Sequence, residues 1–579
     1  MSKLSVDRSP VVKLFSDKES DFLIPDYQRP YAWTTEECET LSDDLWDFAF
    51  PKNNKDLFND TDEYYLGPIV AFRNNNKKLE VIDGQQRLTT LMLILRAFYV
   101  KFLNAADTNT QKTREKISTC IWKTDEFDNP NFDALKIDSE VATDDDKAEF
   151  LEILKTGIAP ESMKSKYATN YRYFQKKITK MADEFDGYAS FMVQRIMNNC
   201  ILLPIEADNQ DTALRIFSTL NDRGLPLSDA DIFKAQFYRY YTDKGEKDTF
   251  MKNWKYLEDL TEKIFHPTNG TPMDELFTRY MYFERAKQGI KRSTTEALRK
   301  FYEKEDYTLL KQDSTLDNLT SLAEFWRDVS LQDDKRFSDE ALKRLFVLNY
   351  APNGMWTQFT SVYYMANRDD RGQLDDKKFC SFLDKMTAFV WSYAFVNPGV
   401  NALRTPLYAE MINIVKDQPV NYSDYKISKE RLKTIIDGFE FVNQRPITKS
   451  MLTWWAFENP EQKLVSLDTV FEIEHIYAKK RQEVEKGLKE HKNIEKLGNK
   501  SLLEKRINIR AADYKFNDKK PYYNGYTTSR GDEKEKTSIR ELIILSNTKD
   551  NFTEDYILER NKNIINHFID YVEAQGITD

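Results

Sequence analysis

A histidine preceded by a glutamate and followed by two asparagines supplies the residue types that phosphodiester hydrolysis requires. They are His475, Glu474, Asn499 and Asn508. A neutral imidazole can deprotonate water near pH 7. Carboxylate and amide oxygens suit Mg²⁺, which stabilises the charge that builds on the phosphorane and the departing oxygen. We therefore predict His475 as the general base and Glu474 and Asn508 as ligands of Mg²⁺ or Mn²⁺.

The local pattern predicts the elements that position these residues. Residues 469–476 alternate apolar and polar side chains, as in a half-buried strand. Residues 497–503 indicate a turn that enters a second short strand, and residues 504–514 a helix that carries Asn508. A histidine on a hairpin and an asparagine on the next helix are the layout of a ββα-metal nuclease.

Other residues of this region have supporting roles in the same interpretation. Asn499 would pin the hairpin loop and hold His475 in orientation. Glu472 is the alternative to Glu474 as the metal ligand. Lys519, or alternatively Arg506, would contact a phosphate oxygen.

A second polar constellation, Asp83-Gly84-Gln85-Gln86-Arg87, lies between a predicted strand and a predicted helix. Glycine permits close backbone approach, a helix N-terminus offers unpaired N–H groups, and Arg87 supplies a planar fork for phosphate. Gln85 and Gln86 would bind a ribose or base edge or place a water, and Thr89 follows on the helix. The sequence has no GxxxxGK[ST] run, which excludes a P-loop.

Motifs in both halves resemble a known family. The runs EIEHI, LGNKSLLEKRIN and Phe516-Asn-Asp-Lys519 resemble the HNH nuclease domain in the D half of GmrSD-type restriction enzymes. Residues 24–33, 81–91 and 217–228, in that order, resemble the S half, whose core is similar to the ParB nuclease-like fold. The chain departs from the pattern at Tyr477, which begins a segment where proline is common, and at Asp513, where asparagine is common.

The resemblance implies roles for further residues. It implies NTP binding and hydrolysis at residues 83–87, with Gln28 and Arg29 beside Arg87 around the phosphates. Asn221 and Arg223 would complete this pocket or stabilise their loop. The aromatic residues of the first motif would stack on a modified base, unless they belong to the core; they are Tyr27, Tyr31 and Trp33.

The expected fold class is α+β and mostly helical, with three domains. We predict a ParB-like α/β domain over residues 1–245, a helical region over 246–440 and an HNH nuclease domain over 441–579. Tyrosine, phenylalanine and tryptophan recur at helical spacing in the middle region, which core packing explains.

Composition limits the class of protein. The net charge of -10 counts against nucleic-acid binding over the whole surface, but residues 479–520 are rich in lysine and arginine. The four cysteines form no CxxC pair, which favours a reducing compartment. Arg96 and Lys101 interrupt the most apolar stretch, residues 88–103. We expect a cytoplasmic protein without a membrane span or a signal peptide.

Together these features predict an NTP-regulated, modification-dependent DNA endonuclease that acts against phage. Its partners would be an NTP of unassigned base and double-stranded modified phage DNA; a homodimer stays open. By resemblance the mark is a modified cytosine, and a phosphorothioate-sensing nicking nuclease of the SspE type shares the layout. The alternatives are a nucleotide-driven DNA-binding switch with an inactive HNH domain, and a toxin that acts on RNA.

Overall fold

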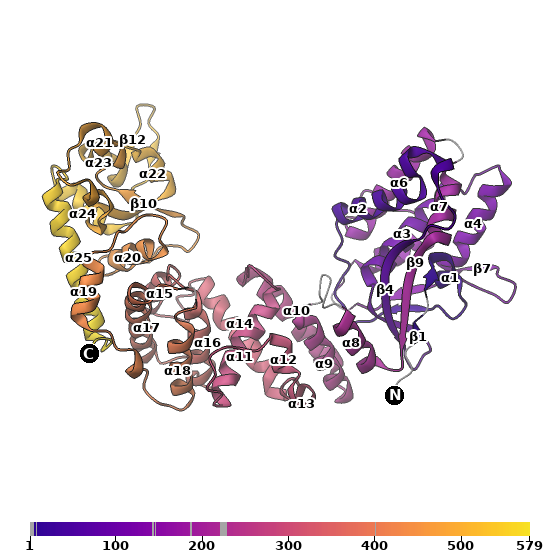
Figure 1. Ribbon diagram of the computed structural model, residues 1–579, viewed down its shortest axis with the longest axis horizontal. Helices are drawn as coiled ribbons and strands as arrows, with labels where there is room; N and C mark the ends of the chain where they lie inside the picture. The colour runs from indigo at the N-terminus through magenta and orange to yellow at the C-terminus, as the bar shows by residue number, and fades with distance from the viewer. Residues whose placement is uncertain are drawn as a thin grey trace. The chain divides into compact units, whose positions relative to one another are not determined.

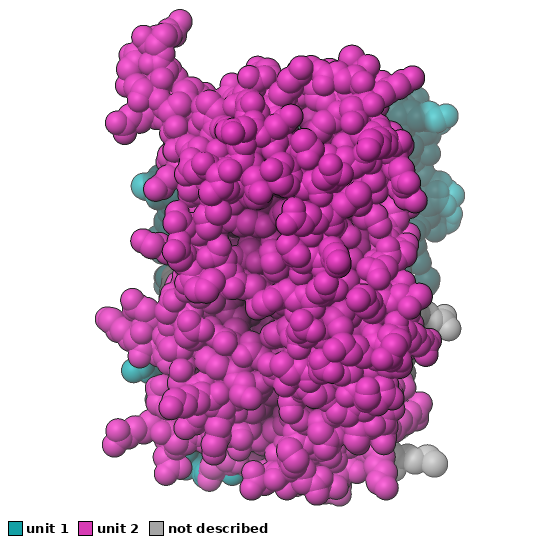
Figure 2. Space-filling view, turned by 90° about the vertical axis from the view of Figure 1, so that its left-hand side faces the viewer, with its two compact units in different colours: residues 1–256 teal, residues 257–579 magenta. Residues whose placement is uncertain are grey.

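The computed structural model describes residues 5–6, 8–141, 144, 146–185, 188–220, 228–399 and 401–579 (Figure 1). The chain forms two compact units, residues 1–256 (unit 1) and 257–579 (unit 2), which Figure 2 shows in different colours. The fold is mostly helical α+β, as the sequence predicts. Among the described residues, no helix has both the length and the apolar composition needed to cross a bilayer.

Unit 1 contains a mixed seven-stranded sheet. Its order is β1-β9-β4-β5-β3-β8, and β2 also pairs with β9. The longest strand, β4, runs parallel to β9 and antiparallel to β5, and β3 runs parallel to β5. The strands are β1 (Ser5–Val6), β2 (Ser9–Pro10), β3 (Phe22–Ile24), β4 (Tyr64–Arg73), β5 (Leu79–Asp83), β8 (Ile137–Ser139) and β9 (Cys200–Ala207). The apolar runs that predict strands in the sequence correspond to β3, β4, β5 and β9.

Two clusters of buried apolar side chains cover this sheet. The larger cluster includes most of α3 (Gln85–Lys101), whose side chains are buried nearly all round. It also involves α1 (Val11–Ser16), α2 (Thr35–Ala49), α4 (Thr108–Ile121), α5 (Lys147–Thr156), α6 (Lys166–Glu184) and α7 (Tyr188–Asn199). The smaller cluster packs α8 (Gln210–Leu220) and α9 (Asp229–Asp243) against β4, β5 and β9. Burial on both sides explains why these strands are apolar throughout and do not alternate.

Unit 2 begins with a helical region whose core is aromatic. Phe325 and Tyr364 stack with ring centres 4.2 Å apart, and Trp391 is completely buried. This burial agrees with the core packing predicted from helical spacing. The main helices are α11 (Pro272–Lys287), α14 (Asp313–Ser330), α15 (Asp339–Leu348), α16 (Met355–Asn367), α17 (Asp376–Val396), α18 (Arg404–Val415), α19 (Lys429–Asp437) and α20 (Pro446–Phe457).

A short hairpin followed by helices forms the C-terminal part of unit 2. Strand β10 (Phe471–His475) pairs antiparallel with β11 (Lys500–Glu504), and α22 (Lys505–Ala511) follows directly. These elements confirm the predicted strand, turn, strand and helix, although α22 ends earlier than predicted. After it come α23 (Phe516–Asn524), a projecting hairpin of β12 (Tyr526–Thr527) and β13 (Glu533–Lys534), α24 (Arg540–Thr548) and α25 (Glu554–Ala574) (Figure 1).

Candidate functional site

The hairpin places His475 at the last position of β10, opposite Lys500 on β11. Side chains alternate along a strand, so Glu472 and Glu474 share one face while His475 projects from the other. The polar residues predicted from the sequence therefore form neighbouring groups around the end of one strand.

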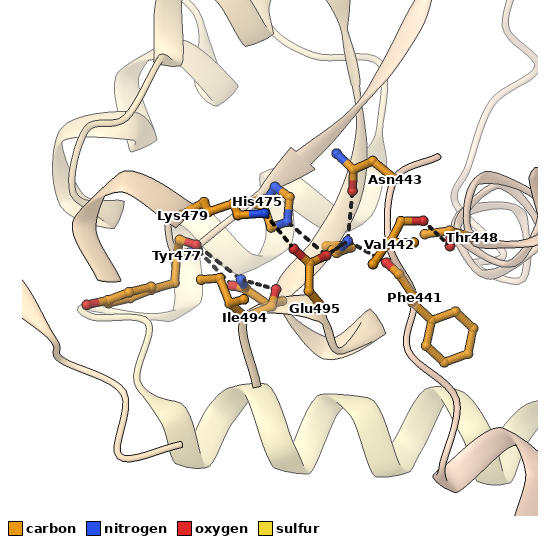
Figure 3. A network of polar contacts seen from close by, with 11 residues as sticks. Phe441, Val442, Asn443, Thr448, His475, Tyr477, Lys479, Ile494 and Glu495 are labelled. Carbon is orange, nitrogen blue, oxygen red and sulfur yellow. Dashed lines mark hydrogen bonds and ion pairs between the residues drawn. The ribbon is translucent and has the colours of Figure 1, made fainter. Parts of the chain in front are cut away.

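His475 faces an acidic partner that the sequence did not predict (Figure 3). Its Nε2 lies 3.6 Å from Glu495 Oε2, a close polar contact that is longer than an ordinary hydrogen bond. Both side chains are largely buried, at 14% and 11% exposure. Because Nε2 faces Glu495, Nδ1 is the nitrogen that would accept a proton from water if His475 acts as the predicted base.

Glu495 is itself held by two lysines. Its Oε1 lies 3.1 Å from Lys479 Nζ, and its Oε2 contacts Lys500 Nζ. His475 and then Lys500 hold the pKa of Glu495 well below its usual range, so the carboxylate is charged. The buried Lys500 ammonium also donates to Asn443 Oδ1 and Phe441 O, which ties β11 to the segment before α20 (Figure 3).

Asn499 fixes the chain immediately after His475. Its Oδ1 accepts from Tyr477 N at 2.8 Å, and its Nδ2 donates to Tyr477 O and Ile494 O, both at 3.1 Å. Its backbone oxygen accepts from Ile476 N at 2.9 Å. Asn499 is completely buried, so these bonds describe a residue that shapes the loop and does not reach a ligand.

Glu474 lies in a buried network with Lys519 and Tyr523. Its Oε1 accepts from Lys519 Nζ at 2.7 Å and from Tyr523 Oη at 2.6 Å. Lys519 also donates to the backbone oxygen of His475 at 2.8 Å, and its side chain is only 1% exposed. In the structure the Lys519 ammonium contacts Glu474 and the backbone of His475, and its contact with a phosphate stays a prediction.

We predict that Lys519→Met destabilises unit 2 by about 3–5 kcal/mol, because it leaves the Glu474 carboxylate buried without its cation. Urea unfolding of the full chain measures the change. Lys515→Met is the matched control, because Lys515 is an exposed lysine that also pairs with a glutamate, Glu485, at 3.5 Å. This substitution should lower the free energy of unfolding by about 0–1 kcal/mol. Equal stabilities of the two variants would show that the buried pair contributes little.

Asn508 and Glu472 meet on the face of β10 that α22 covers. Asn508 Nδ2 donates to Glu472 Oε2 at 3.0 Å, which leaves its Oδ1 as the atom that can ligate an ion. The Glu472 side chain is 40% exposed. Arg506, the alternative phosphate contact, lies on the same helix, and its backbone oxygen accepts from Arg510.

The oxygen atoms around β10 suit Mg²⁺ better than zinc. Within the described part of the chain, no group of three or more histidine, cysteine, aspartate and glutamate side chains has the arrangement of a metal site. That counts against a zinc centre, which takes most of its ligands from the protein. Mg²⁺ keeps several waters and needs one or two carboxylates. The Glu474 bonds that the structure describes all end on Oε1, so Oε2 and Asn508 Oδ1 are donors of the right type.

The N-terminal constellation surrounds Gly84, the residue before α3. Gly84 has φ +93°, and a Cβ there would lie 2.3 Å from Ile69 Cδ1. Arg87 donates from Nη1 to Pro68 O at 2.6 Å. Burial raises the pKa of Asp83, while Arg87 opposes this shift. Glycine is therefore required where β5 enters α3, and the two charged groups lie beside this turn.

We predict that Gly84→Ala destabilises unit 1 by about 2–4 kcal/mol, the sum of a positive φ and a steric clash. Gly245→Ala is the matched control: Gly245 has φ +76° with nothing within 4 Å of the added Cβ, so it should cost about 1 kcal/mol. Denaturant unfolding compares them. Equal losses of unfolding free energy in the two variants would mean that the Ile69 side chain moves aside without an energetic cost.

The three glutamines predicted to contact a nucleotide instead hold the loop over residues 28–33. Gln85 Nε2 donates to Arg29 O at 2.9 Å, and Gln28 Nε2 to Ile82 O at 3.1 Å. Gln86 Oε1 accepts from Ala32 N at 2.7 Å. All three are buried, as is Thr89, and the glutamines support the loop; contact of these four residues with a nucleotide stays a prediction. Arg29 is exposed, and Asp83 and Arg87 are half-buried.

The predicted stacking residues differ in accessibility. Tyr27 donates to Glu80 at 2.9 Å, and Tyr31 stacks on Tyr167 with ring centres 4.8 Å apart. Both tyrosines are only 4% exposed, which favours the alternative that they belong to the core; their stacking on a base stays a prediction. Trp33 is half-buried and stays a candidate. Asn221 and Arg223 lie outside the described residues.

Comparison with known families assigns the class of protein. Residues 11–238 match the model of the GmrSD restriction endonuclease N-terminal domain, and residues 413–567 match that of the GmrSD restriction endonuclease C-terminal domain. The chain is thus a restriction endonuclease. It carries the N-terminal and C-terminal GmrSD domains on a single polypeptide, which makes it a GmrSD-type enzyme and implies a modification-dependent DNA nuclease. No curated protein matches the chain.

Proposed function

We propose that this GmrSD-type enzyme is NTP-regulated, senses modified cytosine in phage DNA and cuts that DNA by metal-dependent hydrolysis. The observation that carries the cutting site is His475 at the end of β10, held between the Asn499 loop and the Glu495 carboxylate. The hairpin with α22 supports a ββα-metal domain over residues 441–579, and the mixed sheet of unit 1 supports a ParB-like domain over residues 1–245. Residues 246–440 link them.

In this proposal each residue around β10 has a separate task. His475 Nδ1 removes the proton from the attacking water, and Glu495 orients the ring and stabilises its protonated form. Glu474 and Asn508, with Glu472 as the alternative carboxylate, would hold Mg²⁺ or Mn²⁺. Such an ion, when bound, neutralises the charge that develops on the phosphorane and the leaving oxygen. Lys519 holds the Glu474 carboxyl group in place through its bond to Oε1.

The regulatory site would use the charged residues that remain accessible in unit 1. Arg87 and Arg29 are the candidates for the phosphates of an NTP, because guanidinium groups bind phosphate in a fork. Asp83 lies beside them, and Gly84 lets the backbone approach. Asn221 and Arg223 stay candidates for the same pocket on sequence grounds.

The test compares DNA substrates that differ only in their modification. The full chain is incubated with Mg²⁺ or Mn²⁺, with and without NTP, on unmodified, 5-hydroxymethylcytosine, glucosylated and phosphorothioate DNA. We expect cutting of a cytosine-modified substrate and little cutting of unmodified DNA. Selective nicking of phosphorothioate DNA would show that the enzyme senses phosphorothioate and not modified cytosine. No cutting of any substrate would indicate a DNA-binding switch, and degradation of RNA alone a toxin.

A further inference from the structure

Lys479 is the exposed member of a group of lysines around the hairpin site. Within the described part of the chain, three lysines form ion pairs with Glu474 or Glu495: Lys479, Lys500 and Lys519. The side chains of Lys500 and Lys519 are 0% and 1% exposed, whereas that of Lys479 is 56% exposed. Of these three lysines, Lys479 is therefore the one that presents its side chain to a molecule arriving from solvent.

The Lys479 ammonium shares a carboxylate with His475 (Figure 3). Lys479 Nζ donates to Glu495 Oε1 at 3.1 Å, and His475 Nε2 lies 3.6 Å from Oε2 of the same group. A single carboxylate thus separates the ammonium from the imidazole. Each strand of duplex DNA carries a phosphate charge about every 3.4 Å along the helix axis, so a strand bound at His475 also passes Lys479.

The backbone that leads to Lys479 is held by the buried Asn499. Ile476 N donates to Asn499 O, Tyr477 N donates to Asn499 Oδ1, and Tyr477 O accepts from Asn499 Nδ2. Lys479 is the first residue of the next helix, α21 (Lys479–Glu485). The bonds that shape the loop after β10 therefore also fix where Lys479 begins. Phosphate contacts in a fixed place set the position of a protein on DNA.

The charges of this group favour an anion as the ligand. Lys479 and Lys500 share the one carboxylate of Glu495, so these ion pairs retain one positive charge while His475 is neutral. An ammonium has three N–H donors, and the bond to Glu495 uses one of them. An ion pair with an exposed partner is weak, so Lys479 can turn toward a phosphate oxygen. We propose that Lys479 contacts a backbone phosphate beside the bond that is cut, an inference that rests on the proposed function.

The salt dependence of DNA binding by Lys479→Gln tests this contact. Binding of the full chain to a duplex that contains 5-hydroxymethylcytosine is measured in EDTA, which withholds the metal ion and keeps the DNA intact, at several salt concentrations. Loss of one phosphate contact should reduce the slope of log K against log salt by about 0.9. Lys480→Gln is the matched control, because Lys480 is the next residue of α21, 71% exposed and paired with Asp513 at 3.4 Å. Its slope should equal that of the wild type.

Kinetics separate a phosphate contact from support of Glu495. A contact lowers the affinity for DNA, and Lys479→Arg, which keeps the charge, restores both the affinity and the slope. A variant Lys479→Gln with the wild-type slope but a lower rate constant at saturating DNA would overturn the proposal, because Lys479 would then only position Glu495. An equal change of slope in Lys480→Gln would also overturn it. The expected slopes in a chain that cuts no DNA with any metal would contradict the proposed function and leave the phosphate contact standing.

Discussion

His475→Ala should lower the rate of DNA cutting by a factor of about 10² to 10⁴, the range that a general base contributes. Its fold should be nearly unchanged. The side chain is 14% exposed, and its Nε2 has no hydrogen-bond partner among the described residues. The bond from Lys519 ends on the backbone oxygen of His475, which alanine retains. Single-turnover cutting of the preferred DNA with Mg²⁺, and thermal unfolding, measure the two effects.

His567→Ala is the matched control for that experiment. His567 lies on α25, 51% exposed, with Nε2 at 2.9 Å from Glu458 Oε2. Like His475→Ala, this substitution removes an imidazole that has a carboxylate partner. His567 is remote in sequence from the hairpin, so the cutting rate should stay at the wild-type value. If His475→Ala cuts as fast as this control, the water-activating group lies elsewhere and the assignment of the hairpin site fails.

Glu495→Gln separates orientation of the ring from its chemistry. Glutamine keeps the shape of the side chain but loses the charge that stabilises protonated His475. A fall in the rate constant at saturating DNA, with unchanged affinity for DNA, would distinguish this role from a merely structural one. The comparison depends on the contact between Nε2 and Oε2 in Figure 3.

Local pattern was sufficient to predict the hairpin and α22, because alternation, the Gly498 turn and the next helix are all encoded within residues 469–511. It was not sufficient to identify Glu495. That residue belongs to a short 3-10 segment, His491–Glu495, which has no periodicity that assigns it a facing partner. The sequence does place two opposite charges, Glu495 and Lys500, on either side of the predicted turn. That the Glu495 side chain points toward His475 depends on the fold and cannot be predicted from this pattern.

The same limit explains the N-terminal glutamines and tyrosines. Their types suit a nucleotide pocket, but an amide that binds ribose and one that holds a loop are the same residue in a sequence. The structure directs Gln85 and Gln86 at backbone atoms of residues 29–33, and Tyr31 at Thr90. Buried polar groups are usually satisfied by backbone, and that competing demand determines their direction here.

Arg87→Ala should reduce NTP turnover at least about a hundredfold, the effect of removing one preorganised donor from a developing charge. The guanidinium is half-buried beside Asp83 and Gly67, at the turn where backbone N–H groups of α3 begin. Release of inorganic phosphate measures turnover. If Arg87→Ala hydrolyses NTP normally, the phosphate site does not lie at this turn.

Two controls separate phosphate binding from support of the backbone, since Arg87 also donates to Pro68 O. Arg73→Ala removes an arginine at the end of the neighbouring strand β4, paired with Glu206 at 2.9 Å, and should leave turnover intact. Arg87→Lys keeps the charge but loses the fork, so it should bind NTP while hydrolysing it slowly. If the lysine variant unfolds like the alanine variant, Arg87 instead supports the packing of α3 on β4, because loss of the bond to Pro68 O would then explain both results.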